Sequence, residues 1–275
     1  MLSDRERKSA EKAFAEEGIE QELTLQQAKA IAEKTKVPLQ GIEWFALEKG
    51  IVPCRYQKNV GNLGIDGQKK LFESSVLVVG LGGLGGFVCE ELARAGTGEI
   101  AAVDHDVFDQ TNLNRQLFAT LQNIGSKKTD VAKKRLQQIN EAVTFRGFSS
   151  PFDKIPADVW KNFDLVFDCL DNIEDRLILA KKCSGANVPL IHGAIAGWCG
   201  EVAVIPPGTQ LLEQIYQRQS KGLEKEFGTP AFTAATAASI MTAEGVKLLT
   251  GKKTDRQRTI LFFDLMEGKW EVAAF

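Results

Sequence analysis

The chain has 275 residues, of which 44% are hydrophobic and 25% charged, and its formal net charge is −2 at neutral pH. This composition is that of a globular protein and excludes an intrinsically disordered chain. The near balance of charge argues against a strongly basic nucleic-acid binder. No apolar run reaches the roughly 18 residues that a membrane span needs, and the segment 1–12 is charged, unlike a signal peptide. We therefore expect a cytoplasmic protein without a membrane partner.

The cysteines and histidines restrict the metal and thiol chemistry. The five cysteines form no Cys-x-x-Cys pair, and an odd number of thiols without an export signal favours the reduced state. No zinc site is therefore expected. Only two histidines, His105 and His192, are present, which leaves little for a histidine-rich metal site or a histidine-centred triad. At Cys199 a small core residue is favoured over a nucleophile.

Residues 1–54 are predicted to form a helical appendage outside the main domain, 55–275. One amphipathic helix begins near Thr24, and a second begins at Pro38 and ends at Gly50. Two short helices in succession are compatible with a helix-turn-helix motif, but the charge of this region is mixed and not basic. We favour an appendage that packs on the main domain or on a partner.

From residue 75 onward, strands and helices alternate. Val76–Val79 is an apolar run typical of a strand buried on both faces, and a glycine-rich turn follows it. Helices are expected over 87–95, 127–140, 175–186 and 232–249, and strands over 99–103, 165–168, 189–194, 201–205, 259–264 and 270–274. Residues 210–228 lack periodicity and are expected to be a mobile connection. The alternation predicts an α/β fold, a Rossmann-like open, mainly parallel sheet with flanking helices and ligands at the carboxyl ends of its strands.

A phosphate-binding loop is predicted between the first of these strands and its helix. Gly80, Gly82 and Gly85 form a Gly-x-Gly-x-x-Gly motif, and Gly83 adds to it. Glycine permits the tight turn and lets backbone N–H groups approach a phosphate at the helix N-terminus. Asp104 ends the next strand, roughly 20 residues beyond the motif, where an acidic residue binds a ribose hydroxyl. The pattern predicts nucleotide binding; the alternative is that the glycines only allow close packing of helix on strand.

The polar residues beyond this loop favour a triphosphate over a dinucleotide. Arg115 lies in the segment Asn112–Gln116 just after the second strand, and Lys128 opens the next helix. Their positive charges suit phosphates near the glycine loop. Asp171 follows the next strand, where a carboxylate can hold Mg²⁺ against phosphate oxygens. Taken singly, Arg115 is better explained as part of a solvated ion pair and Lys128 as a helix-surface charge. Only their joint position on the same sheet edge favours the functional interpretation.

Residues 55–275 resemble the MoeB, ThiF and HesA adenylyltransferases of the ubiquitin-activating-enzyme superfamily. The segments that carry the resemblance are the glycine motif, Asp104, Asn112–Gln116, Lys128, Asp171–Asn172, Arg55–Gly64 and Gly67–Gln68. The resemblance implies a homodimer in which each subunit binds ATP, Mg²⁺ and a small ubiquitin-like sulfur-carrier protein ending in Gly-Gly, such as those of thiamine or molybdopterin biosynthesis.

In the implied reaction, the terminal carboxylate of the carrier attacks the α-phosphate of ATP, pyrophosphate leaves and an acyl-adenylate forms. A terminal carboxylate is already ionised at neutral pH, so the step requires no general base. It requires charge neutralisation and in-line positioning of the reacting groups. The shortage of histidines is therefore no obstacle to this chemistry.

The resemblance assigns catalytic roles to Arg115, Lys128 and Asp171, of which Asp171 also holds Mg²⁺. The implied nucleotide-binding residues are Gly80, Gly82, Gly83, Gly85, Asp104, Asp106, Asn112, Gln116 and Lys58. Lys58 stands where the family often has a second arginine that reaches the ATP of the partner subunit. Many family members also carry two Cys-x-x-Cys pairs, and some use a cysteine before the last long helix; this sequence has neither.

The leading hypothesis is adenylation of a sulfur-carrier-type protein, and three alternatives stay open. The same chemistry acts in this superfamily on peptides or on a carboxyl group of modified tRNA, although the charge makes nucleic acid an unfavourable partner. An NAD-linked oxidoreductase would share the glycine loop and Asp104. A non-catalytic nucleotide-binding scaffold would bind ATP without turnover.

Overall fold

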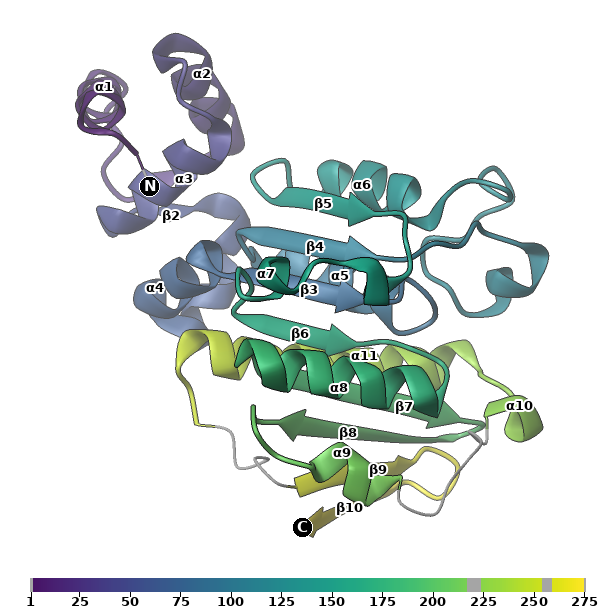
Figure 1. Cartoon of the computed structure of the whole chain (residues 1–275). Helices are drawn as coiled ribbons and strands as arrows, with labels where there is room; N and C mark the ends of the chain where they lie inside the picture. Colours follow the sequence, from purple (N-terminus) through teal and green to yellow (C-terminus); the bar gives the residue numbers. More distant parts are fainter. Residues whose placement is uncertain (1, 217–223, 254–258, 275) are drawn as a thin grey trace.

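The computed structural model describes residues 2–216, 224–253 and 259–274 of the chain. Its centre is an eight-stranded sheet in the order β10-β9-β8-β7-β6-β3-β4-β5 (Figure 1). The parallel strands are β3 (Ser75–Val79), β4 (Glu99–Val103), β5 (Thr144–Phe148), β6 (Leu165–Asp168) and β7 (Leu190–Ala196). The antiparallel strands are β8 (Cys199–Ile205), β9 (Thr259–Asp264) and β10 (Lys269–Ala274). The predicted Rossmann-like, mainly parallel sheet is confirmed.

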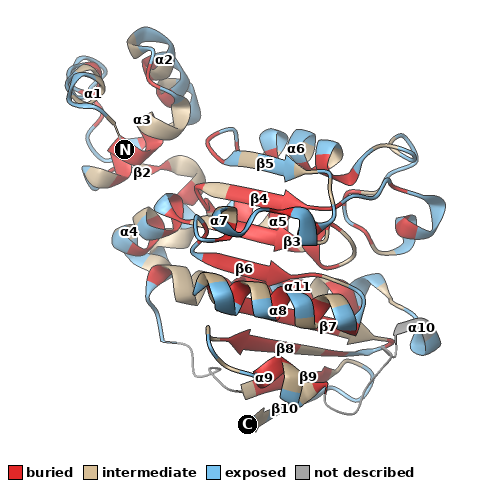
Figure 2. Ribbon diagram, in the orientation of Figure 1, coloured by how far each residue is buried: buried red, intermediate tan, exposed pale blue. Residues whose placement is uncertain are grey.

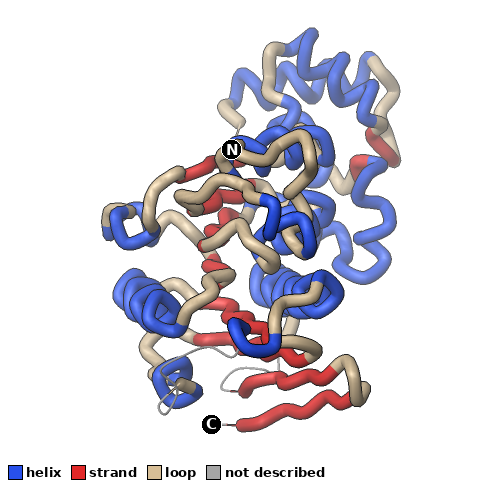
Figure 3. The backbone as a smooth tube through the Cα atoms, turned by 90° about the vertical axis from the view of Figure 1, so that its right-hand side faces the viewer, coloured by secondary structure: helices blue, strands red, loops and turns tan. Residues whose placement is uncertain are grey.

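Helices cover both faces of this sheet, so the sheet and its helices form three layers (Figure 3). One face packs against α5 (Gly85–Ala95), α6 (Lys128–Ile139) and α11 (Ala231–Thr250). The other face packs against α7 (Ala157–Trp160), α8 (Ile173–Ala186) and α9 (Leu211–Ile215). Figure 2 shows the central strands β3, β4 and β6 as buried. Because both faces are covered, these strands are apolar at nearly every position instead of alternating.

The N-terminal region forms its own hydrophobic cluster beside one end of the sheet. It contains α1 (Asp4–Glu16), α2 (Leu25–Thr35), α3 (Leu39–Glu48) and two short parallel strands, β1 (Glu22–Leu23) and β2 (Val52–Pro53). Thr24 caps α2 through a capping box with Gln27, and Pro38 precedes α3, which confirms the helices expected there. A long helix, α4 (Gln57–Glu73), joins this region to the sheet and is broken at Gly64, where φ is 72°.

Two expectations are wrong. The supposed connection over 210–228 contains the short helices α9 and α10 (Glu224–Phe227), although 217–223 lie outside the described residues. Cys199 is exposed and not in the core, because it is the first residue of β8, opposite Asp264, where solvent reaches the sheet. Within the ranges that the structure describes, no helix is long and apolar enough to cross a membrane.

Candidate nucleotide-binding site

A cleft of about 730 Å³ opens at the carboxyl ends of β3, β4 and β6. It lies at the point where the strand order reverses, because β3 is flanked by β4 on one side and by β6 on the other. The predicted residues that line it are Gly80, Gly82, Gly83, Asp104, Asp106, Arg115, Gln116, Lys128 and Asp171. The fold thus brings most of the predicted set to one place. Three other described members of the set, Gly85, Asn112 and Lys58, do not line the cleft.

The glycines of the motif have two different roles, close packing for some and access to a ligand for others. Gly80 has a φ of 95°, and a Cβ atom there would lie 2.6 Å from the carbonyl oxygen of Cys169. A Cβ atom at Gly85 would lie 1.8 Å from the carbonyl oxygen of Gly80. These two glycines are therefore required for the turn and for the packing of α5 on β3. Gly82 and Gly83 line the cleft as Gly80 does, but no such close contact with a described residue requires a glycine there, and their backbone is accessible to a ligand.

Asp104 fixes the glycine loop to the end of β4. Its Oδ2 accepts a hydrogen bond of 2.7 Å from the backbone N–H of Leu81, and its Oδ1 accepts one of 2.8 Å from that of Asp106. A carboxylate has about four acceptor positions, so both bonds leave capacity for a ligand hydroxyl. Asp104 can therefore hold the loop and a ribose at the same time.

Lys128 is buried beside Asp104 and Asp106 at the first position of α6. Only 5% of the residue is exposed, and its Nζ lies 3.0 Å from Oδ2 of Asp106 and 3.5 Å from Oδ2 of Asp104. A hydrogen bond from its backbone N–H to the carbonyl oxygen of Asp106 fixes the start of the helix there. The alternative of a solvated helix-surface charge is wrong for this residue. A buried ammonium group facing the cleft is suited to phosphate oxygens.

Arg115 lies at the end of a 3-10 helix, η2 (Gln110–Asn114), on the rim of the cleft. Its Nη1 donates to the backbone carbonyl of Thr111 and to Oδ1 of Asn114, at 3.1 and 2.8 Å. Among the residues that the structure describes, no carboxylate forms an ion pair with it. Asn112 is buried and accepts a hydrogen bond from the N–H of Asp109, so its visible role is to shape the turn that carries Arg115.

Gln116 lines the cleft and carries a side-chain acceptor without a partner in the described part of the chain. The residue is 6% exposed, and its buried Oε1 has no hydrogen-bond partner within the described ranges. A buried polar atom without a partner costs free energy, which a ligand N–H or O–H donor would recover. Together with Lys128, Arg115 and the bare glycine backbone, this acceptor fits a nucleotide.

Asp171 is exposed in the loop between β6 and α8. Its neighbour Asn172 caps α8 by accepting a hydrogen bond of 2.8 Å from the N–H of Asp175. The described residues contain no cluster of three or more side chains able to hold a metal ion. A single carboxylate nevertheless fits Mg²⁺ that is shared with substrate phosphates, which is the common arrangement for this ion.

Lys58 lies far from this cleft. It is exposed on α4, and Figure 1 shows α4 at the opposite end of the sheet from the carboxyl ends of β3, β4 and β6. Within one chain, its side chain therefore does not reach the cleft.

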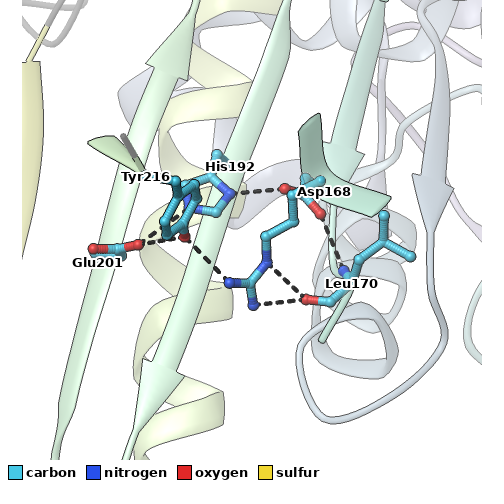
Figure 4. A network of polar contacts seen from close by, with 6 residues as sticks. Asp168, Leu170, His192, Glu201 and Tyr216 are labelled. Carbon is cyan, nitrogen blue, oxygen red and sulfur yellow. Dashed lines mark hydrogen bonds and ion pairs between the residues drawn. The ribbon is translucent and has the colours of Figure 1, made fainter. Parts of the chain in front are cut away.

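A buried polar network that no sequence motif indicated lies on the α8 and α9 side of the cleft (Figure 4). His192 in β7 places Nδ1 2.7 Å from Oδ2 of Asp168 and Nε2 3.0 Å from the hydroxyl of Tyr216. Tyr216 donates to Oε1 of Glu201 at 2.6 Å and accepts from Nη1 of Arg176 at 3.2 Å. Asp168 and His192 are paired positions of adjacent strands, so only the strand order could have revealed this contact.

The pKa shifts of this network favour its ionised form. Burial alone would lower the pKa of His192, but hydrogen bonds to Asp168 and Glu201 outweigh this effect and raise it. Burial acts to raise the pKa of Glu201, but the hydrogen bond to His192 lowers it overall. Burial raises the pKa of Tyr216, which keeps its hydroxyl protonated.

Similarity to known proteins identifies the family of this chain. A model described as the ThiF family matches residues 56–275. The sulfur carrier protein ThiS adenylyltransferase of Escherichia coli is 30% identical over 227 residues, which cover 80% of this chain and 90% of that protein. The molybdopterin-synthase adenylyltransferase of Haemophilus influenzae is 37% identical over 153 residues, which cover 54% of this chain and 63% of that protein.

This chain spans between 48% and 63% of the length of three curated relatives, the Haemophilus protein among them. A solved structure of E. coli MccB has a TM-score of 0.68 at 20% identity and covers 90% of this chain and 82% of its own. That likeness concerns the fold alone. Since the family match extends from the start of α4 through the whole sheet and its cleft, the chain belongs to the ThiF family.

Proposed function

We propose that this protein is an ATP-dependent adenylyltransferase that activates the C-terminal glycine carboxylate of a small ubiquitin-like sulfur-carrier protein. The observation that carries the proposal is the convergence of Lys128, Arg115 and Asp171 with the glycine loop in one cleft, although they come from separate elements. The names of the E. coli and Haemophilus relatives, each an adenylyltransferase, support it. An NAD-linked dehydrogenase has no comparable need for two cations at the phosphate loop.

In this proposal the protein supplies charge and position. The carrier carboxylate attacks the α-phosphorus, the bond to the β-phosphate oxygen breaks and pyrophosphate leaves, with no proton to transfer. Lys128 and Arg115 stabilise the charge that spreads over the phosphate oxygens. Asp104 and Asp106 lie where the ribose would bind, and Gln116 accepts a hydrogen bond from the nucleotide. Asp171 would hold Mg²⁺, which when bound neutralises phosphate charge.

The proposal includes a homodimer. Lys58 lies at the other end of the sheet from its own cleft, so it would contribute to catalysis only at the ATP of a partner subunit. We also propose that 55–275 form the adenylation domain, that 1–54 are a helical appendage, that the protein needs no zinc, and that it acts in the cytoplasm.

The test is ATP–pyrophosphate exchange with Mg²⁺, run with Gly-Gly-terminated carrier proteins from the same genome. Exchange that depends on one carrier would support the reaction and identify the substrate. The matched control is the same carrier without its last glycine, which should support no exchange. ATP binding without exchange for any carrier would indicate another acceptor or a non-catalytic scaffold, and tight NAD binding in its place would indicate an oxidoreductase.

A further inference from the structure

The network of Asp168, His192, Glu201, Tyr216 and Arg176 has no part in the chemistry proposed above. Asp168 and His192 are fully buried, and Arg176 is 4% exposed. A buried polar network is costly unless every member is satisfied. This network joins two cations and two carboxylates from three strands and a helix, and it adjoins the cleft.

The pattern of hydrogen-bond donors and acceptors around the ring requires a positive charge on His192. Oδ2 of Asp168 lies 2.7 Å from Nδ1 of His192 and, as a carboxylate oxygen, accepts a hydrogen bond from it. The one hydroxyl proton of Tyr216 is directed to Oε1 of Glu201 at 2.6 Å, so the Tyr216 oxygen is an acceptor toward Nε2 of His192 at 3.0 Å. Both ring nitrogens therefore donate, which only the imidazolium form does. The charged and titratable groups that face the ring are those of Asp168, Glu201 and Tyr216, with Arg176 behind the Tyr216 hydroxyl.

The network holds both backbone polar groups of Leu170. The N–H of Leu170 donates to Oδ1 of Asp168 at 3.1 Å. Its carbonyl oxygen accepts from Nε and Nη2 of Arg176 at 3.2 and 2.9 Å. Leu170 directly precedes Asp171, and both residues line the cleft. The orientation of the peptide group before Asp171 is therefore fixed by charged side chains that themselves depend on His192 and Tyr216.

We propose that His192 and Tyr216 are positioning residues that hold Asp168 and Arg176, and through them set Leu170 and Asp171 for binding of a magnesium–nucleoside triphosphate. Neither residue needs to touch the ligand. The inference rests on the proposed function for the class of ligand, but the carrier protein plays no part in it. It assigns a role to one residue of β7 and to the residue that follows α9, neither of which belongs to the family motifs in the sequence.

The first experiment measures Kd for ATP with and without Mg²⁺, by calorimetry on the full chain. Tyr216→Phe keeps the ring and removes the hydroxyl at the centre of the network, and we expect it to weaken Mg²⁺–ATP binding roughly tenfold. Binding of metal-free ATP should change less than twofold, because Asp171 contributes through the metal. Tyr56→Phe is the matched control. Tyr56 is also buried and its hydroxyl accepts a hydrogen bond from Asn140, but it has no contact with this network.

A double-mutant cycle tests the route through Asp171. In an Asp171→Ala background, Tyr216→Phe should cause no further loss of Mg²⁺–ATP affinity, because the two changes remove the same contribution. Full additivity would overturn the proposed route. Equal behaviour of Tyr216→Phe and Tyr56→Phe would overturn the proposal as a whole. If the wild-type protein binds no ATP, the proposed function fails first, and the inference fails with it.

The charge of His192 is tested without any ligand. With only two histidines in the chain, a His105→Asn variant leaves a single imidazole in two-bond ¹H–¹⁵N spectra. We expect both ring nitrogens of His192 to be protonated at neutral pH. A neutral tautomer would contradict the hydrogen-bond assignment and, with it, the network as drawn in Figure 4.

Discussion

Lys128 at the start of α6 and Asp106 after β4 form an ion pair of 3.0 Å at the edge of the nucleotide cleft, and Lys128 is almost completely buried. The neighbouring residue Lys127 is exposed. Two consecutive lysines therefore place one ammonium group inside the cleft and one outside it.

This contrast gives a matched pair of substitutions. Lys128→Ala removes charge stabilisation at the phosphates and should lower the adenylation rate by roughly 10²- to 10³-fold. Lys127→Ala removes the same group from the surface and should leave the rate within about twofold. Carrier-dependent ATP–pyrophosphate exchange measures both. Equal effects of the two substitutions would mean that general surface charge, and not the buried ammonium, matters.

Arg115 should matter for activity and not for stability. Among the described residues, the guanidinium of Arg115 bonds only a backbone carbonyl and an amide oxygen, so Arg115→Ala should change the free energy of unfolding by about 0.5 kcal/mol or less. The adenylation rate should fall to background. Urea denaturation and pyrophosphate exchange separate the two effects. An Arg115→Ala variant that keeps a near-wild-type rate would show that our assignment of the cleft residues is wrong.

Two Gly→Ala substitutions, one inside the glycine motif and one outside it, should have opposite effects on stability. In Gly85→Ala the new methyl group would meet the carbonyl oxygen of Gly80, so the free energy of unfolding should fall by about 3 kcal/mol or more. Gly185 in α8 has nothing within 4 Å of the added atom, so Gly185→Ala should raise it by about 0.5–1 kcal/mol. Urea denaturation of both variants tests the prediction, and equal signs would contradict it.

The buried carboxyl group of Glu43 should make the stability of the protein depend on pH. Burial raises its pKa to about 7, and Arg55 only partly opposes this effect. Between the ordinary pKa of about 4.5 and about 7, the folded protein holds a proton that the unfolded chain has lost, so this group lowers stability as the pH rises. Its contribution between pH 4 and pH 8 is on the order of 3 kcal/mol.

The measurement is urea denaturation of wild type and Glu43→Gln at pH 5 and pH 8. We expect the variant to gain stability relative to wild type as the pH rises, although the loss of the partner of Arg55 lowers both values. Parallel pH profiles would falsify the raised pKa. Glu48→Gln is a suitable control, because Glu48 is more exposed and pairs with Arg7 on the same helical region.

Features that depend on neighbouring residues could be predicted from the amino-acid sequence alone. The strand β3, the glycine turn, α5 and Asp104 follow each other along the chain, so local periodicity and spacing were enough to predict them. The strand β5 escaped prediction because it lies at the edge of the sheet and its residues are mostly exposed, so its sequence lacks an apolar run. The helix α4 was not predicted either, because the glycines at 61, 64 and 67 are unfavourable inside a helix.

Contacts between residues that are distant in the sequence follow from the arrangement of whole strands and helices. The pairing of Asp168 with His192 depends on β7 lying beside β6, and the contact of Tyr216 with both Glu201 and Arg176 depends on α9 packing beside α8. The burial of Lys128 and the exposure of Cys199 likewise depend on what covers each position in the folded molecule. The strand order and the packing of helices arise from burial of whole sheet faces, a long-range effect that no local pattern in the sequence encodes.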